Sequence, residues 1–176
     1  NVEVCIRDNN PKGSAKTIVD KYSNNISIKY SRNSTNIGVG NNILNVVDCA
    51  EGKYSWIMGN DDMVLPYTFE RLDELLNNNN EIEYYFINSY SAPYELILND
   101  DQNLNYDTIL SNLQKFSNIN YSGIVKYTEL INYKVSWDFL LGIFLSIFNT
   151  EKWLENKYNV NITEVSDSRY YTNKYN

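Results

Sequence analysis

The sequence predicts an α/β fold in which helices flank a mostly parallel sheet. Short apolar runs rich in β-branched residues alternate with helix-like patterns from residue 2 to residue 76, separated by turns rich in Asn, Gly and Pro. The 176 residues, 43% hydrophobic and 21% charged, suffice for one core and predict a single domain over residues 1–176. In such folds, ligands bind beyond the carboxyl ends of the strands.

The first strand is predicted over residues 2–6, and the turn-rich segment 7–13 displays Asp8 at its end. Ser14 is a helix-capping residue type. The helix that follows has apolar residues at helical spacing: Ala15, Ile18, Val19 and Tyr22.

A second strand is predicted over residues 26–30, followed by a polar turn through Arg32 and Gly38. The next helix is predicted to end at Gly52, a typical C-terminal residue. Its apolar face comprises Val39, Ile43, Val46, Val47 and Ala50.

The third strand is predicted over residues 54–58, and residues 59–62, GNDD, form its terminal loop. Pro66 suits the first turn of the next helix, whose apolar residues are Phe69, Leu72, Leu75 and Leu76. Because Asp8, Arg32 and GNDD all follow strands, we expect them to share one rim of the sheet.

The second half carries weaker signals after a polar linker over residues 77–80. The apolar run 139–148 predicts a core strand or strand pair, and its ten residues are too few to span a membrane. Further strands are predicted over 83–90 and 94–98, and helices over 104–116 and 150–158.

Composition excludes several classes of function. A net charge of -7 argues against a nucleic-acid partner, which normally meets a clustered basic face. The absence of His excludes Ser-His-Asp and Cys-His catalysis and leaves carboxylates as the expected bases and metal ligands. Cys5 and Cys49 lie in apolar surroundings, which favours a reduced, cytoplasmic protein.

Three stretches together resemble glycosyltransferase family 2: V-E-V-C-I-R-D-N-N at 2–10, R-N-S-T-N-I-G-V-G-N-N at 32–42, and A-E-G-K-Y-S-W-I-M-G-N-D-D-M-V-L-P at 50–66. The resemblance implies the Rossmann-like GT-A fold, with residues 1–76 as the nucleotide-sugar-binding half and residues 81–176 as the acceptor-side half. Such proteins usually begin with a further strand that this sequence lacks, so we expect a fragment of a longer chain.

Residues of the first two stretches match the family's nucleotide pocket. Asp8, with Asn10 beside it, corresponds to the acidic residue that contacts the nucleotide; the alternative is an Asx-turn former. Arg32 matches a basic position of the same pocket, and its alternative is a solvated surface residue. Asn36, Gly38 and Asn42, with Asn33, match an Asn-Gly motif for which a loop-shaping role is favoured.

GNDD corresponds to the family's acidic motif, which implies Mg²⁺ or Mn²⁺ held by Asp61 and Asp62, with Asn60 near the nucleotide-sugar. Gly59 and Asn60 stand where acidic residues are common, so the charge complement is smaller. The alternative is a polar loop in which Asp62 serves the dipole of the following helix.

The resemblance implies inverting transfer with a carboxylate base. Weak candidates for this base are Asp138, Glu164 and Asp167, each more readily read as a surface acid. Trp137 and Trp153 could stack on a sugar, although a core position is favoured for both.

The leading hypothesis is a metal-dependent glycosyltransferase that moves a sugar from a nucleotide-diphospho-sugar donor to a glycan or lipid-linked acceptor, in bacterial surface polysaccharide synthesis. A lipid-linked acceptor would bring peripheral membrane contact at the inner face of the cell membrane. The alternative is a non-catalytic module that binds nucleotide-sugar or glycan. A nucleotidyltransferase ranks last, because a glycine-rich phosphate loop is missing near the start. The oligomeric state is left open.

Overall fold

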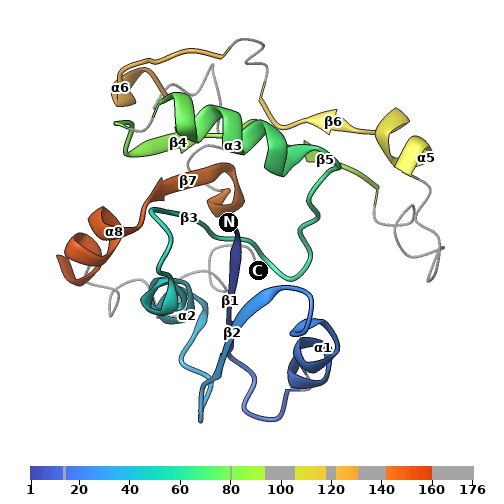
Figure 1. The fold of residues 1–176 in the computed structure, drawn as a ribbon, viewed down its shortest axis with the longest axis vertical. Helices are drawn as coiled ribbons and strands as arrows, with labels where there is room; N and C mark the ends of the chain where they lie inside the picture. The colour runs from blue at the N-terminus through green and yellow to red at the C-terminus, as the bar shows by residue number, and fades with distance from the viewer. Residues whose placement is uncertain (14, 80, 94–105, 118–121, 131–141, 160–176) are drawn as a thin grey trace, which may run out of the picture. The chain divides into compact units, whose positions relative to one another are not determined.

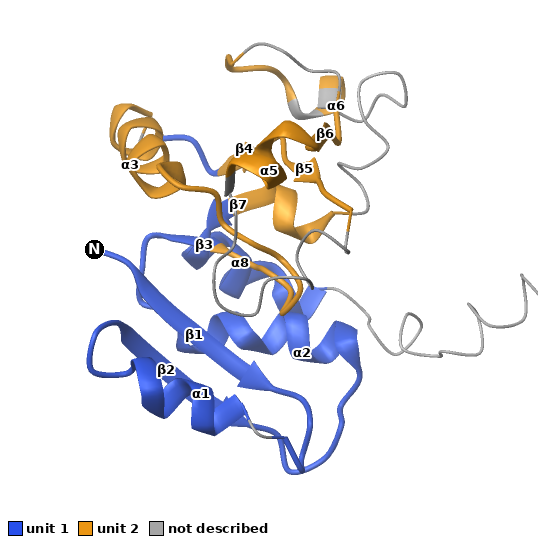
Figure 2. Ribbon diagram, turned by 90° about the vertical axis from the view of Figure 1, so that its right-hand side faces the viewer, with its two compact units in different colours: residues 1–55, 80–83, 148–176 blue, residues 56–79, 84–147 orange. Residues whose placement is uncertain are grey.

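The computed structural model describes residues 1–13, 15–79, 81–93, 106–117, 122–130 and 142–159. These residues form a mixed α/β fold with small sheets. The chain divides into two compact units, shown in blue and orange in Figure 2. Unit 1 comprises residues 1–55, 80–83 and 148–176, and unit 2 comprises residues 56–79 and 84–147.

Figure 1 labels the α-helices and strands along the chain. The first part contains β1 (Glu3–Asp8), α1 (Ala15–Tyr22), β2 (Ser27–Arg32), α2 (Val39–Val46), the short 3-10 helix η1 (Val47–Cys49), β3 (Tyr54–Trp56) and α3 (Thr68–Asn78). The second part contains β4 (Tyr84–Phe86), β5 (Tyr90–Ser91), α5 (Tyr106–Ser111), β6 (Gln114–Lys115), α6 (Tyr127–Leu130), η2 (Ile143–Leu145), β7 (Ser146–Asn149), α8 (Thr150–Asn156) and η3 (Lys157–Asn159).

Strands β1 and β2 of unit 1 pair in parallel, in a register that runs from Glu3 opposite Ser27 to Asp8 opposite Arg32. The connection between them contains α1, as a parallel pair requires a crossover. Helix α1 contacts β2 and helix α2 contacts β1. The predicted β-α-β start of the fold is therefore confirmed.

Helix α1 buries less of its apolar face than its spacing predicts. Val19 is buried, whereas the side chains of Ile18 and Tyr22 are 64% and 44% exposed. In the described part of the chain, the β1–β2 sheet next to α1 has two strands, so it offers a narrow surface on which the helix can pack.

The second helix begins after Gly38, whose φ of 81° is in the region that glycine adopts most easily. It ends earlier than predicted: α2 ends at Val46, and η1 continues only to Cys49. The prediction that Gly52 ends the helix is wrong. Gly52 instead donates its backbone N–H to Glu3 Oε1 at 2.9 Å.

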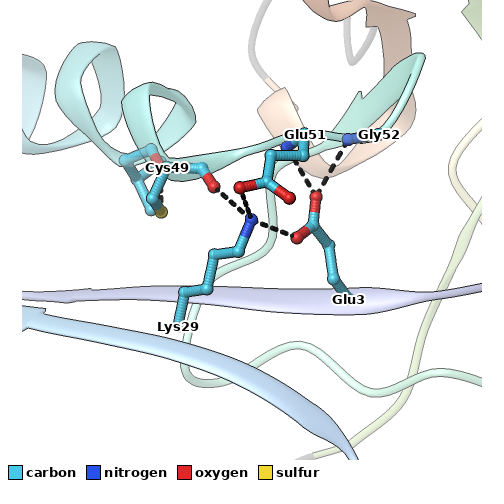
Figure 3. A network of polar contacts seen from close by, with 6 residues as sticks. Glu3, Lys29, Cys49, Glu51 and Gly52 are labelled. Carbon is cyan, nitrogen blue, oxygen red and sulfur yellow. Dashed lines mark hydrogen bonds and ion pairs between the residues drawn. The ribbon is translucent and has the colours of Figure 1, made fainter.

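Glu3 and Lys29 join the amino-terminal part of the β1–β2 pair to the loop after η1 (Figure 3). Lys29 Nζ lies 2.7 Å from Glu3 Oε2 and 2.9 Å from Glu51 Oε1, and it donates to the Cys49 carbonyl at 3.1 Å. Glu3 Oε1 also accepts the backbone N–H of Glu51 at 2.6 Å. The Lys29 ammonium lowers the pKa of Glu3, and these carboxylates raise the pKa of Lys29.

Strands β3, β7 and β4 form a second sheet in the order β3-β7-β4. Helix α3 begins at Thr68, after Tyr67 with a φ of 64°. Pro66 therefore precedes the helix. The prediction that it lies in the first turn of the helix is wrong. The apolar side chains of α3 differ in their burial: Phe69 is 51% exposed, whereas Leu72 is half-buried.

In unit 2, the segment predicted as one helix over 104–116 contains a short helix followed by a short strand. Helix α5 buries Ile109, but Gln114 and Lys115 form β6, which pairs antiparallel with β5. Phe116 lies outside the helix, and its ring packs edge-on against Phe144 with centroids 5.4 Å apart. The pairing with β5 overrides the local helical pattern.

The predicted helix over 150–158 is confirmed as α8, with Asn149 accepting the Lys152 N–H at its start. Trp153 stacks on Phe148 with ring centroids 4.5 Å apart, which confirms its packing role. Lys157 is 6% exposed and forms an ion pair with Asp48. Among the described residues, none of the helices has the length and apolar content that a membrane span needs.

Some predictions fall outside the described residues. They concern the Ser14 cap, the strand over 94–98, residues 139–141 of the apolar run, Trp137 and the three candidate bases Asp138, Glu164 and Asp167.

Candidate functional site

Asp8 is the last residue of β1, where the sequence predicts a nucleotide-binding carboxylate. Its Oδ1 accepts the backbone N–H of Asn10 at 2.9 Å, so the Asx-turn interpretation is confirmed. Its Oδ2 accepts the Tyr30 hydroxyl at 3.2 Å. A carboxylate oxygen can accept two hydrogen bonds, so Asp8 keeps acceptor capacity for a ligand.

Gly13 provides the space that this carboxylate occupies. A Cβ built on Gly13 would lie 2.6 Å from Asp8 Oδ2 and 3.0 Å from Asp8 Oδ1. The backbone N–H of Gly13 donates to the carbonyl of Asn10 at 2.9 Å, and the Asn10 side chain accepts from the Lys12 N–H at 3.0 Å. The turn after β1 thus folds back beside the Asp8 carboxylate.

Arg32 is opposite Asp8 in the β1–β2 register and is exposed. Its guanidinium donates to the Gly13 carbonyl at 3.5 Å, a weak hydrogen bond that leaves most of its donors available. Tyr30 precedes it by two residues on β2 and therefore lies on the same face. Desolvation and the Asp8 carboxylate raise the pKa of Tyr30. Its hydroxyl is a donor at neutral pH, as that of an ordinary tyrosine with a pKa of about 10 would be.

Asn33 is the centre of a side-chain hydrogen-bond network next to Asp8, whose carbonyl accepts the Asn33 backbone N–H at 2.9 Å, and it is only 8% exposed. Its Oδ1 accepts from Arg7 Nε at 3.0 Å. Its Nδ2 donates to Asn9 Oδ1 at 3.1 Å and to Asn42 Oδ1 at 2.9 Å. Asn42 in turn donates to the Arg7 carbonyl at 3.0 Å. The network joins the ends of β1 and β2 to α2.

Asn36 shapes the loop before α2. Its Oδ1 accepts from Asn9 Nδ2 at 2.8 Å and from the Gly38 N–H at 2.9 Å. Asn9 Oδ1 also accepts the Ile37 N–H at 3.0 Å. The Asn36 and Asn42 side chains are therefore engaged within the protein, in agreement with the loop-shaping interpretation.

The GNDD loop belongs to unit 2 and is held by contacts within itself. Gly59 donates its N–H to Asp62 Oδ2 at 2.6 Å, and Asp62 donates its N–H to the Gly59 carbonyl at 3.4 Å. The interpretation that Asp62 serves the dipole of the next helix is wrong, since α3 begins only at Thr68. Asn60 and Asp61 are exposed.

The two carboxylates of this loop could contribute to a divalent-cation site. A Cβ on Gly59 would lie 2.5 Å from Asp61 Oδ1 and 3.2 Å from Asp62 Oδ2, so both carboxylates lie over the face that glycine leaves open. Within the part of the chain that the structure describes, acidic and cysteine side chains form no group of three or more. Two carboxylates fit Mg²⁺ or Mn²⁺ when substrate phosphates and water complete the coordination.

The structure thus brings Asp8, Asn10 and Arg32 together in unit 1 and Asn60, Asp61 and Asp62 together in unit 2. Their predicted convergence on one rim involves both units and stays a prediction. Sequence reasoning missed the roles of Arg7, Asn9 and Tyr30. A usable signal was present: Asn9 and Asn33 each follow a strand end directly, and parallel pairing brings such positions together.

Comparison with known proteins identifies two similarities. Residues 1–140 match the model of the family described as glycosyl transferase family 2. An abequosyltransferase, RfbV, from Salmonella typhimurium (strain LT2) is 35% identical over 83 residues. That segment covers 46% of this chain and 25% of the relative, so the chain spans about a quarter of the relative's length. No solved structure matches the chain significantly.

Proposed function

Because the chain belongs to glycosyl transferase family 2, we propose that it takes part in moving a sugar from a nucleotide-diphospho-sugar to a glycan or lipid-linked acceptor. The family match over residues 1–140 carries the proposal. The similarity to an abequosyltransferase supports sugar transfer in bacterial surface polysaccharide synthesis. We further propose the GT-A arrangement, of which the parallel β1–β2 pair would be part. With a lipid-linked acceptor, the reaction would take place at the inner face of the cell membrane.

Asp8, Asn10 and Arg32 are the proposed nucleotide-binding residues. The Asp8 carboxylate is an acceptor that can receive hydrogen bonds from a base N–H or from ribose hydroxyls. Arg32, opposite it in the register, presents a guanidinium that can bind a base or a phosphate. Asn36, Gly38 and Asn42 would hold the adjoining loop in shape for the donor.

Asp61 and Asp62, with Asn60, are the proposed residues for the diphosphate and its cation. When bound, Mg²⁺ or Mn²⁺ would stabilise the negative charge that develops on the departing diphosphate. The Gly59 N–H fixes one oxygen of Asp62, which leaves Asp61 as the more available carboxylate. Inverting transfer also needs a base for the acceptor hydroxyl, and Asp138, Glu164 and Asp167 stay candidates for it.

A thermal-shift titration tests donor binding directly. The chain is heated with UDP, GDP, dTDP or CDP, each with and without Mn²⁺, because a ligand that binds the folded state raises the unfolding midpoint. We expect a Mn²⁺-dependent rise with one nucleotide and a smaller rise in Asp8→Asn and Asp61→Asn variants. If none of the nucleotides shifts the midpoint, donor binding by this chain is refuted.

The second candidate is a module that binds nucleotide-sugar or glycan without turnover. It is favoured by the small number of acidic groups around GNDD, which form no cluster of three among the described residues. Incubation with the donor that gives the thermal shift separates the two functions. Release of free nucleotide would support the transferase, whereas binding with an intact donor over many hours would support the module.

A further inference from the structure

The Tyr30 hydroxyl contacts the proposed nucleotide-binding carboxylate from a neighbouring strand. It donates to Asp8 Oδ2 at 3.2 Å, while the Asn10 N–H holds Asp8 Oδ1 at 2.9 Å. Each carboxylate oxygen is thus bound by one group of the protein. Together with the Asp8 backbone in β1, these two bonds define how the carboxylate plane is turned.

The surroundings of Tyr30 support this orientation. Its side chain is half-buried on β2, two residues before Arg32. Lys16 Nζ lies 5.9 Å from the centre of its ring, and Arg32 is opposite Asp8 in the register. The hydroxyl is protonated at neutral pH and can donate, since an ordinary tyrosine pKa is about 10 and the pKa of Tyr30 is raised further. Gly13 also makes room for the Asp8 carboxylate, because a Cβ at this position would collide with it.

We propose that Tyr30 is a positioning residue for nucleotide recognition, which holds the Asp8 carboxylate in the orientation that a nucleotide meets. The inference rests on the proposed function of Asp8. Without the hydroxyl, the Asn10 N–H is the one hydrogen bond that the described residues still give the carboxylate, which can then rotate about its side-chain bonds. Ligand binding must then also fix the orientation of the carboxylate. This loss of side-chain entropy weakens binding, although no group that touches the ligand has been removed.

The test is a double-mutant cycle of Tyr30→Phe and Asp8→Asn, with nucleotide affinity measured by calorimetry for the nucleotide that stabilises the unaltered chain. Removing one such hydrogen bond should weaken binding about 5- to 10-fold in Tyr30→Phe. In the Asp8→Asn background, the same substitution should change affinity by less than about 2-fold, because Tyr30 acts through the carboxylate. A purely structural role would weaken both backgrounds equally and would overturn the inference.

Tyr22→Phe is the matched control, since Tyr22 lies on α1 and is 44% exposed. It should leave nucleotide affinity unchanged, and the unfolding midpoints without ligand show whether each variant folds. Weakening by Asp8→Asn with none by Tyr30→Phe would overturn the inference and leave the proposed function standing. Absence of nucleotide binding by the unaltered chain would refute the proposed function and the inference together.

Discussion

The loop after β1 and the loop after β3 each place a carboxylate over a glycine, yet they are supported differently. Asp8 is bound by the Tyr30 hydroxyl from another strand, and its carbonyl accepts the backbone N–H of Asn33, the centre of the side-chain network. In the part of the chain that the structure describes, the GNDD loop is bound through its own Gly59 and Asp62. The first carboxylate is therefore pre-oriented by tertiary contacts, whereas the second has freedom to adjust to a cation and a diphosphate.

The largest expected effect comes from the loop with local support. Replacing Asp61 by Ala should lower sugar transfer by about 100-fold or more, because charge stabilisation at the leaving group is a large catalytic term. The unfolding free energy should change little, since Asp61 is exposed. Transfer assays with a range of Mn²⁺ concentrations measure the effect; undiminished turnover would remove Asp61 from the reaction.

The next largest effect is expected from removing Asn33, the centre of the side-chain network next to Asp8. Asn33→Ala should reduce the unfolding free energy by roughly 2–3 kcal/mol, because Asn33 is buried and the half-buried Arg7, Asn9 and Asn42 each lose a hydrogen-bond partner. Urea denaturation measures the change. Asn24→Ala, at an exposed position, is the control and should stay within about 0.5 kcal/mol. Equal stability of the two variants would contradict the proposed support of the first loop.

A smaller effect is expected from filling the space next to Asp8. In Gly13→Ala, the new Cβ would meet Asp8 Oδ2 at 2.6 Å, and the carboxylate would rotate away from the Tyr30 hydroxyl. Nucleotide affinity should fall about 5- to 10-fold with a minor loss of stability. Gly52→Ala is the control, because its nearest atom lies at 3.4 Å. Unchanged affinity in Gly13→Ala would mean that the orientation of Asp8 is unimportant.

The smallest effect concerns the other end of β1. The pKa of Glu3 is lowered by its hydrogen bond to Lys29, so its contribution is present above the unfolded pKa and is lost as the pH falls through the folded value. Glu3→Gln should therefore cost roughly 1 kcal/mol at pH 7 and nothing once the pH is below that window. Urea denaturation at a series of pH values from 7 downwards checks this, with the exposed Glu81→Gln as control. A cost that stays constant over the whole series, without the decline that protonation of Glu3 requires, would show that charge is not the cause.

Local patterns predicted many elements but failed where packing decided the outcome. The alternation of strands and helices to α3, and the presence of helix α8, followed from residue spacing and turn residues. Phe116 left its predicted helix because β5 offered a strand partner. Gly52 was read as a helix end because a glycine after a helical pattern is typical of one, but the Glu3 carboxylate binds its N–H. A carboxylate 49 positions away in the chain leaves no mark in the local pattern.

The family, the parallel β1–β2 pair and the residue types of the candidate site could be predicted from the sequence, because short segments of residues are enough to specify strands, turns and acidic loops. Which of these residues have neighbours that restrain them depends on contacts between distant segments, so the folded chain was needed to find them. Asn33 lies between Arg7, Asn9 and Asn42, and Tyr30 reaches Asp8 across the sheet. Such contacts join residues 9 to 26 positions apart. Strand pairing brings distant positions within hydrogen-bond distance. It is the reason that Asp8 is oriented by a neighbouring side chain, whereas Asp61 is exposed.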